Sequence, residues 1–388
     1  MSRFNYKLIL YIIGLLLLFN SAAILLTSLV SYLSKDGFFY NILNSSIICF
    51  VIGAVIMFFS KNSTKVINRR DGYLIVILGW LTMVCSGTLP YVFTNTINNI
   101  PDLIFETMSG YTTTGSSIIS DIEALPESII FWRSMTHWLG GMGIIVLAIA
   151  ILPLLGIGGM QLFSAEAPGS GISGDKIHPR ISNTAKRLWF IYIGLTLLET
   201  FLLNIAGMSL FDAVNHSMSN IATGGFSTKN DSLSFWNTMP MVQYIIVFFM
   251  ILAGTNFLLI YLTIIGKFKK LIFNTEFIWF IGMISFFVII TTLILNNNID
   301  LNTTNFDHPQ VYGKFEASFR HALFQVVAVI TTTGFVTGDF AGWSPFLTML
   351  FFGLMFFGAS SGSTSGGIKI SRHLILIKNG LLEFKRSL

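Results

Sequence analysis

The sequence predicts an all-α polytopic membrane protein built from tandem units, each consisting of a helix, a short re-entrant pore loop and a second helix. Of its 388 residues 53% are hydrophobic and only 11% are charged, with a mean hydropathy of +0.73. A soluble domain carries about a quarter charged residues, so a soluble globule is excluded. Eight apolar runs approach or exceed the roughly 20 residues that cross a bilayer. A short semi-polar segment also recurs three times between these runs.

The apolar runs fall into pairs along the chain. The first follows Arg3 and Lys7 and is far longer than the roughly 7–15 residues of a signal-peptide core, so we expect it to be retained. We divide the chain into an N-terminal transmembrane helix pair over 1–62 and three repeats over 70–160, 184–268 and 274–388. The runs are Lys7–Leu33, Phe38–Ser60, Asp71–Thr94, Ser128–Leu155, Ala185–Met208, Met239–Ile265, Thr275–Leu295 and Trp343–Lys378.

The net charge of +5 is distributed in a way that indicates topology rather than nucleic-acid binding. Basic clusters separate the pairs of runs and alternate with acid-leaning stretches, as the positive-inside rule describes. This pattern predicts a cytoplasmic N-terminus and a basic cytoplasmic tail. Cys49 and Cys85 lie inside apolar runs and predict neither a disulfide framework nor a metal site.

The recurring segment gives the chain an internal repeat. Its three copies read Phe105-ETMSGYTTTGS, Val214-NHSMSNIATGG and Phe324-QVVAVITTTGF. Aligned on their shared Thr-Gly step, they place Gly115, Gly224 and Gly334 about 110 residues apart. Non-helical backbone at membrane depth is tolerated where protein buries it or where it lines a water-filled cavity. Three such loops therefore predict a shared central cavity.

The chemistry of these loops fits a cation filter. A filter replaces the hydration shell of an ion with backbone carbonyls, and glycine tolerates the backbone conformations that this requires. The C-terminus of the preceding short helix carries partial negative charge, and the loops contain no Lys or Arg. The predicted filter residues are Thr112, Thr113, Thr114, Gly115, Ile221, Ala222, Thr223, Gly224, Thr331, Thr332, Thr333 and Gly334.

We expect other polar residues near the loops to have structural or interfacial roles, not to bind the ion. Three share the position nine residues before the aligned glycine, and we favour a structural role for them near the start of the re-entrant helix: Glu106, Asn215 and Gln325. The histidines lack metal-ligand spacing and are expected to be packed or interfacial: His137, His216 and His321. Arg133 and Arg320 are interpreted as interfacial anchors.

With these segments in hand, the sequence resembles the Trk/Ktr/HKT superfamily of potassium transporters, and within it most closely the TrkH family of bacterial Trk-type systems. The likeness is carried by SGYTTTGSS, by Trp132-RSMTHWLGGMGIIVLAIAILP, by IATGGFST, by TTTGF and by Gly358-ASSGSTSGGIK. It covers the chain from Asp71 onward, and the extra N-terminal helix pair is similar to that of the Trk branch.

The resemblance implies potassium uptake through the filter, not enzymatic activity. It implies K⁺ as the transported ion, no covalently bound cofactor, and the inner membrane of a bacterium as the location. It also implies a homodimer and a cytosolic TrkA-like nucleotide-binding regulatory subunit. The glycine-rich stretch is similar to the intramembrane loop that gates the pore in this superfamily, although a simple helix break is an alternative. Its residues are Gly358, Ser361, Gly362, Ser363, Gly366 and Gly367.

Two further expectations stay open at this point. The superfamily closes its filter with four repeats, whereas the period places a fourth copy beyond Leu388, so we expect a fragment holding three of the four. The alternatives are a Na⁺-permeable or ion-coupled secondary cation transporter of the same superfamily and, in another class, a membrane-embedded enzyme. Glu199 lies in the middle of an apolar run, where a charged residue is a functional candidate by default.

Overall fold

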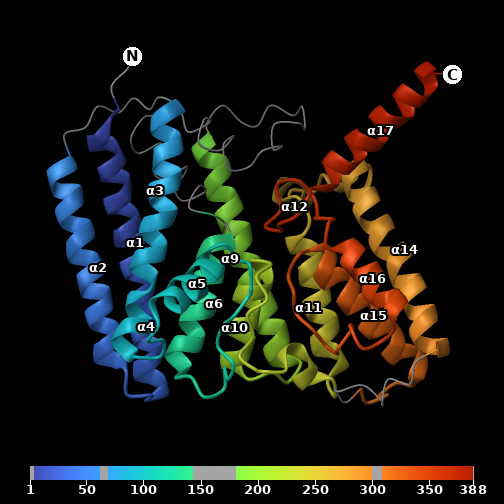
Figure 1. The fold of residues 1–388 in the computed structure, drawn as a ribbon, viewed down its shortest axis with the longest axis horizontal. Coiled ribbons are helices and arrows are strands. Elements are labelled where there is room, and N and C mark those ends of the chain that lie inside the picture. Colours follow the sequence, from blue (N-terminus) through green and yellow to red (C-terminus); the bar gives the residue numbers. More distant parts are fainter. Residues whose placement is uncertain (1–3, 62–68, 142, 144–180, 299–307, 388) are drawn as a thin grey trace. The chain divides into compact units, whose positions relative to one another are not determined.

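The computed structural model describes residues 4–61, 69–141, 143, 181–298 and 308–387, and these are helical with irregular connections (Figure 1). The helices are α1 (Tyr6–Ser34), α2 (Phe39–Ser60), α3 (Arg69–Gly87), α4 (Leu89–Thr94), α5 (Ile100–Tyr111), α6 (Glu127–Gly141), α9 (Ile181–Ile205), α10 (Leu210–Ile221), the 3₁₀-helix η2 (Ser232–Trp236), α11 (Pro240–Ala253), α12 (Phe257–Ile264), α13 (Phe268–Ile272), α14 (Thr275–Asn298), α15 (Lys314–Ile330), α16 (Pro345–Leu354) and α17 (Ile370–Ser387).

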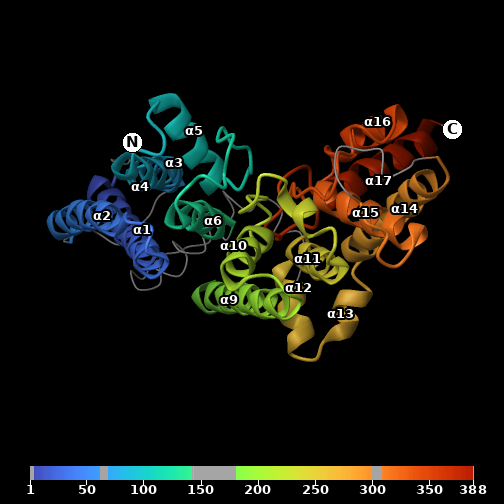
Figure 2. The same cartoon turned by 90° about the horizontal axis from the view of Figure 1, so that it is seen from below.

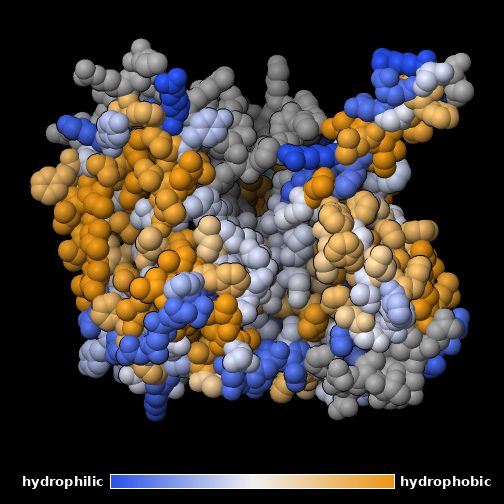
Figure 3. Space-filling view, in the orientation of Figure 1, coloured by the Kyte–Doolittle hydropathy of each residue, from blue (hydrophilic) through white to orange (hydrophobic). Residues whose placement is uncertain are grey.

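Within the described residues, five helices are long and apolar enough to cross a membrane, or six if the bent pair α11 and α12 forms one span. This confirms the predicted fold class of an all-α membrane protein. Apolar side chains such as Phe50, Val55 and Phe58 are exposed along α2, and its outer face is a continuous hydrophobic surface (Figure 3). The second half of the predicted run Ser128–Leu155 lies outside the described residues.

The chain divides into two compact units, Met1–Phe190 and Ile191–Leu388. In the first unit α1 packs along α2 and also contacts α3 and α6, while α5 contacts α3 and α6 (Figures 1 and 2). The contact between α1 and α2 depends on small residues. A Cβ added to Gly53 would lie 2.9 Å from the carbonyl oxygen of Gly14 and 2.9 Å from Cβ of Leu17, so glycine is what lets the two backbones approach.

The connection between α1 and α2 also fixes the start of α6. Asp36 accepts hydrogen bonds from the amides of Phe38, at 3.1 Å, and Ser128, at 3.0 Å, and from the hydroxyl of Ser31. Partial burial raises the pKa of the Asp36 carboxyl, but the hydrogen bonds from Ser128, Ser31 and Phe38 outweigh it and leave the pKa below its usual value. A carboxylate is favoured there because it faces the positive end of α6.

In the second unit α15 lies at the centre, in contact with α11, α14 and α16 (Figure 2). Residues Val326–Ile330 of this helix are buried in the apolar core of the unit. Its first turn contains Lys314 and Glu316, which are at least partly exposed. The last five residues of α15 are apolar on all sides, as expected of a helical segment that is buried on all sides.

The apolar run Met239–Ile265 forms two helices. Here α11 and α12 meet at a bend of 104°, with Gly254, Thr255 and Asn256 between them. Asn256 caps the new start, since its side chain accepts a hydrogen bond from the amide of Leu258 at 2.8 Å. Asparagine is a strong N-cap residue, so the sequence contained the signal for a second helix start.

The glycine contact in the first unit is testable because it reverses the usual effect of a substitution. Replacing a helical glycine with alanine normally stabilises a helix by about 1 kcal/mol. We expect Gly53→Ala to lower the midpoint of thermal unfolding in detergent, because its Cβ meets the α1 backbone. Gly282→Ala is the matched control, since a Cβ there meets no atom within 4 Å and should raise the midpoint. Equal shifts for both variants would contradict this account of the helix pair.

Candidate functional site

The helices α5, α10 and α15, which the sequence predicts to be re-entrant, end in the same backbone turn. Two residues beyond each helix a threonine adopts a left-handed φ, at 53°, 53° and 56° for Thr113, Thr223 and Thr332. Two residues further on a glycine does so, at 78°, 85° and 79° for Gly115, Gly225 and Gly334. Positive φ is uncommon outside glycine, so this recurrence marks one shared conformation. We call residues 112–115, 222–225 and 331–334 filter segments one, two and three.

The amides of each filter segment point back at its own helix. The amides of Thr113, Thr223 and Thr332 donate to carbonyls of the last helical turn at 2.8–3.0 Å, and the next amide in each segment does the same at 2.9 Å. In a trans peptide the carbonyl points opposite to the amide that follows it. Two consecutive carbonyl oxygens of each segment therefore point away from the helix, as ligands of a bare cation must.

This turn corrects the alignment of the second repeat by one residue. Ile221 is the last residue of α10, and the glycine with positive φ is Gly225, not Gly224. The alignment on Thr-Gly steps failed because the second copy reads Thr-Gly-Gly, so two registers fit equally well. Gly225 is required on steric grounds too, since a Cβ there would collide with the carbonyl oxygen of Thr333 in filter segment three.

Threonine hydroxyls brace two of the three turns. Thr112 donates to the carbonyl of Met108 at 2.7 Å and its hydroxyl lies 2.8 Å from that of Thr114. Thr331 and Thr333 repeat this arrangement, with the same 2.8 Å between their hydroxyls. Ala222 has no hydroxyl to do so in filter segment two. These hydroxyls bond within the turn, so backbone carbonyls are the oxygens that the filter segments direct away from the helix.

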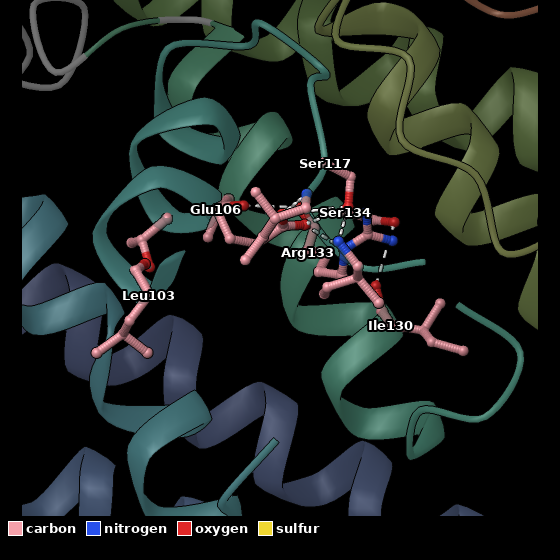
Figure 4. Close-up of polar contacts among 10 residues, drawn as sticks. Leu103, Glu106, Ser117, Ile130, Arg133 and Ser134 are labelled. Carbon is pink, nitrogen blue, oxygen red and sulfur yellow. Dashed lines mark hydrogen bonds and ion pairs between the residues drawn. The ribbon is translucent and has the colours of Figure 1, made fainter. Parts of the chain in front are cut away.

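The residues flanking filter segment one form a buried ion pair (Figure 4). Arg133 on α6 donates from Nε to Glu106 on α5 at 2.9 Å, and their side chains are 1% and 0% exposed. Arg133 is thus not the interfacial anchor that the sequence suggested. Glu106 also accepts hydrogen bonds from the hydroxyl of Ser117, at 3.0 Å, and the amide of Ile118, at 3.0 Å. The expected structural role of Glu106 is confirmed, although it lies in the middle of α5.

The second unit contains further buried polar groups around α10 and α15. Arg320 is 1% exposed and donates to Glu316 at 2.8 Å and to Gln243, so its predicted interfacial position is wrong as well. His321 lies 3.0 Å from His308 and 2.9 Å from the hydroxyl of Thr337. Among the described residues, no group of three or more His, Cys, Asp or Glu side chains could hold a metal ion.

Glu199 touches the end of a re-entrant helix. This fully buried carboxyl on α9 accepts a hydrogen bond from Asn220 at 2.6 Å. The same Asn220 amide group donates to the carbonyl of Ile246 on α11 at 3.0 Å. Asn220 precedes filter segment two by two residues, so Glu199 holds the C-terminal end of α10 in place.

The glycine-rich stretch folds into a closed loop between α16 and α17, here called the intramembrane loop (residues 358–367). Its ends meet in a parallel bridge between Phe357 and Ile368, and Gly358 donates to the carbonyl of Ile368 at 2.9 Å. The loop is hydrogen-bonded to the bend between α11 and α12. Ser360 donates to the carbonyl of Gly254 at 3.0 Å, and Phe257 donates to the carbonyl of Gly362 at 3.2 Å. Backbone groups left open by the bend are thereby satisfied.

The intramembrane loop also contacts filter segment three and the residue that precedes filter segment two. Thr364 donates to the carbonyl of Ile221 at 3.0 Å, immediately before filter segment two. Gly366 donates to the hydroxyl of Thr332 in filter segment three at 2.7 Å. In this conformation the loop is hydrogen-bonded to filter segment three and to the residue that precedes filter segment two.

Two charged side chains that were not predicted as site residues also hold the intramembrane loop. Glu276, in the first turn of α14, accepts a hydrogen bond from the amide of Ser361 at 2.6 Å. Lys369 donates to the carbonyl of Ser365 and to the hydroxyl of Ser363, at 3.4 Å. Ser363 and Ser365 also bond one another, at 2.8 Å. A carboxylate at the start of an apolar run was the available sequence signal for Glu276.

The buried pair behind filter segment one leads to a stability prediction. Arg133→Met leaves the Glu106 carboxylate buried without its cation, which costs about 3–5 kcal/mol. We expect a large drop in the midpoint of thermal unfolding, partly recovered in the double variant Glu106→Gln/Arg133→Met. Arg386→Met is the control, because its ion pair with Glu383 is 74% and 71% exposed and such pairs contribute little. Similar losses for Arg133→Met and Arg386→Met would refute the assignment.

Comparison with known proteins places this geometry in a family. Residues 39–387 match the family model of TrkH, described as a cation transport protein. The Trk system potassium uptake protein TrkH of Salmonella typhimurium is 39% identical over 98% of this chain and 77% of the relative. TrkG of Escherichia coli, also named a Trk system potassium uptake protein, is 34% identical over all of this chain and 77% of the relative.

A solved structure agrees with the sequence matches. The crystal structure of the potassium transporter TrkH from Vibrio parahaemolyticus superposes with a TM-score of 0.81 at 36% identity, covering 98% of this chain and 76% of that one. The family match spans both compact units and includes all three filter segments and the intramembrane loop. The chain belongs to the TrkH family of cation transport proteins.

Proposed function

We propose that this chain is the pore-forming subunit of a Trk-type system and takes up K⁺ across the cell membrane. The observation that carries the proposal is the turn shared by the three filter segments, which directs consecutive carbonyls away from each helix. Carbonyl oxygens replace the hydration shell of K⁺ without a titratable ligand. The relatives cited above are named potassium uptake proteins, which favours K⁺ over the Na⁺-permeable alternative.

The ion-binding residues follow from the corrected register. We assign the filter to Thr112–Gly115, Ala222–Gly225 and Thr331–Gly334, with the backbone carbonyls as ligands and K⁺ as cargo. Filter segments two and three support this assignment by their close backbone contact at Gly225 and Thr333. The partial negative charge at the C-terminal end of each re-entrant helix adds to the attraction of a cation.

The intramembrane loop is the proposed gate. It lies against filter segment three and the residue preceding segment two, and its only covalent connections are α16 and α17. A few hydrogen bonds hold the loop against the α11–α12 bend and against Glu276. These hydrogen bonds can break without unfolding a helix, because each contributes only about 0.5–1.5 kcal/mol net.

The assembly and topology are proposed in the same way. Relatives named as parts of a Trk system support association with other Trk components, which we take to be a second copy of the chain and a cytosolic TrkA-like nucleotide-binding subunit. The alternation of basic and acidic stretches supports a cytoplasmic N-terminus in a bacterial inner membrane. The division into a helix pair over 1–62 and repeats over 70–160, 184–268 and 274–388 stays a prediction.

The filter is tested by a substitution that alters backbone preference without a steric clash. Gly334 has φ +79° and a Cβ there meets no atom within 4 Å, so Gly334→Ser acts through conformation alone. We expect it to lower the ratio of ⁸⁶Rb⁺ to ²²Na⁺ uptake in a K⁺-uptake-deficient bacterium and to impair growth on low K⁺. Gly313→Ser is matched, since Gly313 has φ +97° in equally open space but lies before α15.

Two outcomes would count against the filter. The first is wild-type chain that restores neither growth nor ⁸⁶Rb⁺ uptake when the protein is present in the membrane. The second is a Gly334→Ser variant whose ion ratio equals that of Gly313→Ser.

The proposed gate is tested by weakening the contacts between the intramembrane loop and the α11–α12 bend. Gly362 has φ +74°, and a Cβ there would lie 3.1 Å from the side-chain amide nitrogen of Asn256. We expect Gly362→Ala to raise ⁸⁶Rb⁺ flux and to leave the Rb⁺ to Na⁺ ratio unchanged. Gly266→Ala, at φ +86° with no atom within 4 Å of its Cβ, controls for backbone strain. A changed ratio with unchanged flux would remove the loop from the role of gate.

A further inference from the structure

We infer that one side chain on each of α5 and α10 holds the outer end of its filter segment and so helps set ion selectivity: Glu106 through Ser117, and His216 through Ser227. This inference rests on the proposed function and adds positioning residues to it. The corrected register makes the two pairs equivalent. In each repeat the helix residue lies nine positions before the filter glycine, Gly115 or Gly225, and the serine lies two positions after it.

The first pair is held by charge. Ser117 donates its hydroxyl toward both oxygens of Glu106, at 3.0 and 3.1 Å, and accepts a hydrogen bond from Nη2 of Arg133 at 3.0 Å. The amide of Ile118 donates to the same carboxylate at 3.0 Å. The chain leaving filter segment one is therefore fastened at two successive residues to the helix that enters it (Figure 4).

The second pair is held by the imidazole of His216, whose complete burial disfavours a charged ring. Nδ1 of His216 lies 2.8 Å from the backbone carbonyl of Asp212, and a carbonyl can only accept, so Nδ1 carries the proton. Nε2 of the neutral ring is then an acceptor, and the hydroxyl of Ser227 donates to it at 2.9 Å. The Ser227 oxygen in turn accepts from the amide of Lys229 at 3.1 Å.

The His216 ring also contacts the residue that directly follows filter segment three. Its centroid lies 5.0 Å from that of Trp236 and 5.7 Å from that of Phe335. Phe335 directly follows Gly334, the glycine of filter segment three. The ring is completely buried, so His216 packs against protein on the side of filter segment three and not against solvent.

We call each of the pairs Glu106–Ser117 and His216–Ser227 a clamp. The third repeat has other residues at these two positions, and its backbone is held in a different way. The equivalent positions are Gln325 and Val336, and valine has no hydroxyl to donate. There the backbone is held from the second repeat: Leu233 donates to the carbonyl of Val336 at 3.0 Å, and Val336 donates to the hydroxyl of Ser232 at 3.3 Å. All three filter segments thus have a fastened outer end, two of them by a side-chain pair.

These clamps do not contribute ligands, and their effect on ions is indirect. They fix where the chain leaves the filter, which limits how far the last carbonyls can move when a smaller ion binds. One such hydrogen bond contributes about 0.5–1.5 kcal/mol. If this free energy appears in full as a difference in binding between the two ions, it changes the ratio of K⁺ to Na⁺ binding by about 2- to 10-fold.

The test compares Ser227→Ala with Ser227→Thr, which keeps the hydroxyl, and with Ser217→Ala. Ser217 is a buried α10 residue whose hydroxyl donates only within its own helix, to Ala213 at 2.7 Å. The readouts are the ratio of ⁸⁶Rb⁺ to ²²Na⁺ uptake in cells and the difference in thermal stabilisation of the purified chain by K⁺ and by Na⁺. We expect Ser227→Ala to lower both preferences by about 2- to 10-fold, with Ser227→Thr and Ser217→Ala like wild type.

A double-variant cycle tests whether the two residues act as one unit. Once His216→Ala has removed the acceptor, adding Ser227→Ala should cause no further loss of selectivity. The clamp is overturned if Ser227→Ala keeps wild-type preferences in both readouts, or if the two losses add independently. If His216→Ala fails to fold, Ser227→Ala alone decides.

Failure of the clamp is distinguishable from failure of the proposed function. Wild-type chain without ⁸⁶Rb⁺ uptake would refute the function, and the clamp would then be judged by ion-specific stabilisation of the purified chain. If the wild-type chain also shows no preference for K⁺ over Na⁺ in that measurement, the clamp is refuted as well.

Discussion

The constraint on which this structure depends is that backbone amides and carbonyls cannot remain unpaired where water is excluded. A continuous helix meets it automatically, but a cation filter needs carbonyls that no amide occupies. The re-entrant helices resolve this conflict within each repeat. They accept the amides of the filter segment at their last turn, and the carbonyls that precede those amides point away from the helix, where we propose that the ion binds. Each departure from helix is thereby limited to the few groups of the proposed filter.

The same constraint accounts for the bend between α11 and α12. A turn of 104° at Gly254–Asn256 opens the hydrogen-bond ladder of a span, which would be costly if nothing else supplied partners. The intramembrane loop supplies them, through Ser360 and Gly362. Two irregular segments far apart in sequence therefore satisfy one another. Neither would be expected to keep its shape without the other, so the broken span and the glycine-rich loop are one structural feature.

Most of the fold was predictable because hydropathy and the repeat are properties of whole segments. The errors were local. Thr-Gly-Gly in the second copy allowed two registers, and only the positive φ of Gly225 separates them. Arg133 looked like an interfacial residue because an isolated arginine near a helix end usually is one; its partner Glu106 lies across a loop whose folding the sequence does not specify. The role of Glu276 depends on a contact with Ser361 that is equally remote in sequence.

The way the third filter segment is fastened has a consequence for biogenesis. Val336 has no side-chain partner on its own re-entrant helix and is held by Ser232 and Leu233 of the preceding repeat. Chains are synthesised from the N-terminus, and earlier parts fold first. The segment that completes the third filter turn is therefore already in the membrane when that turn emerges. The second repeat acts as a template for the third, and the order of repeats along the gene becomes an order of assembly.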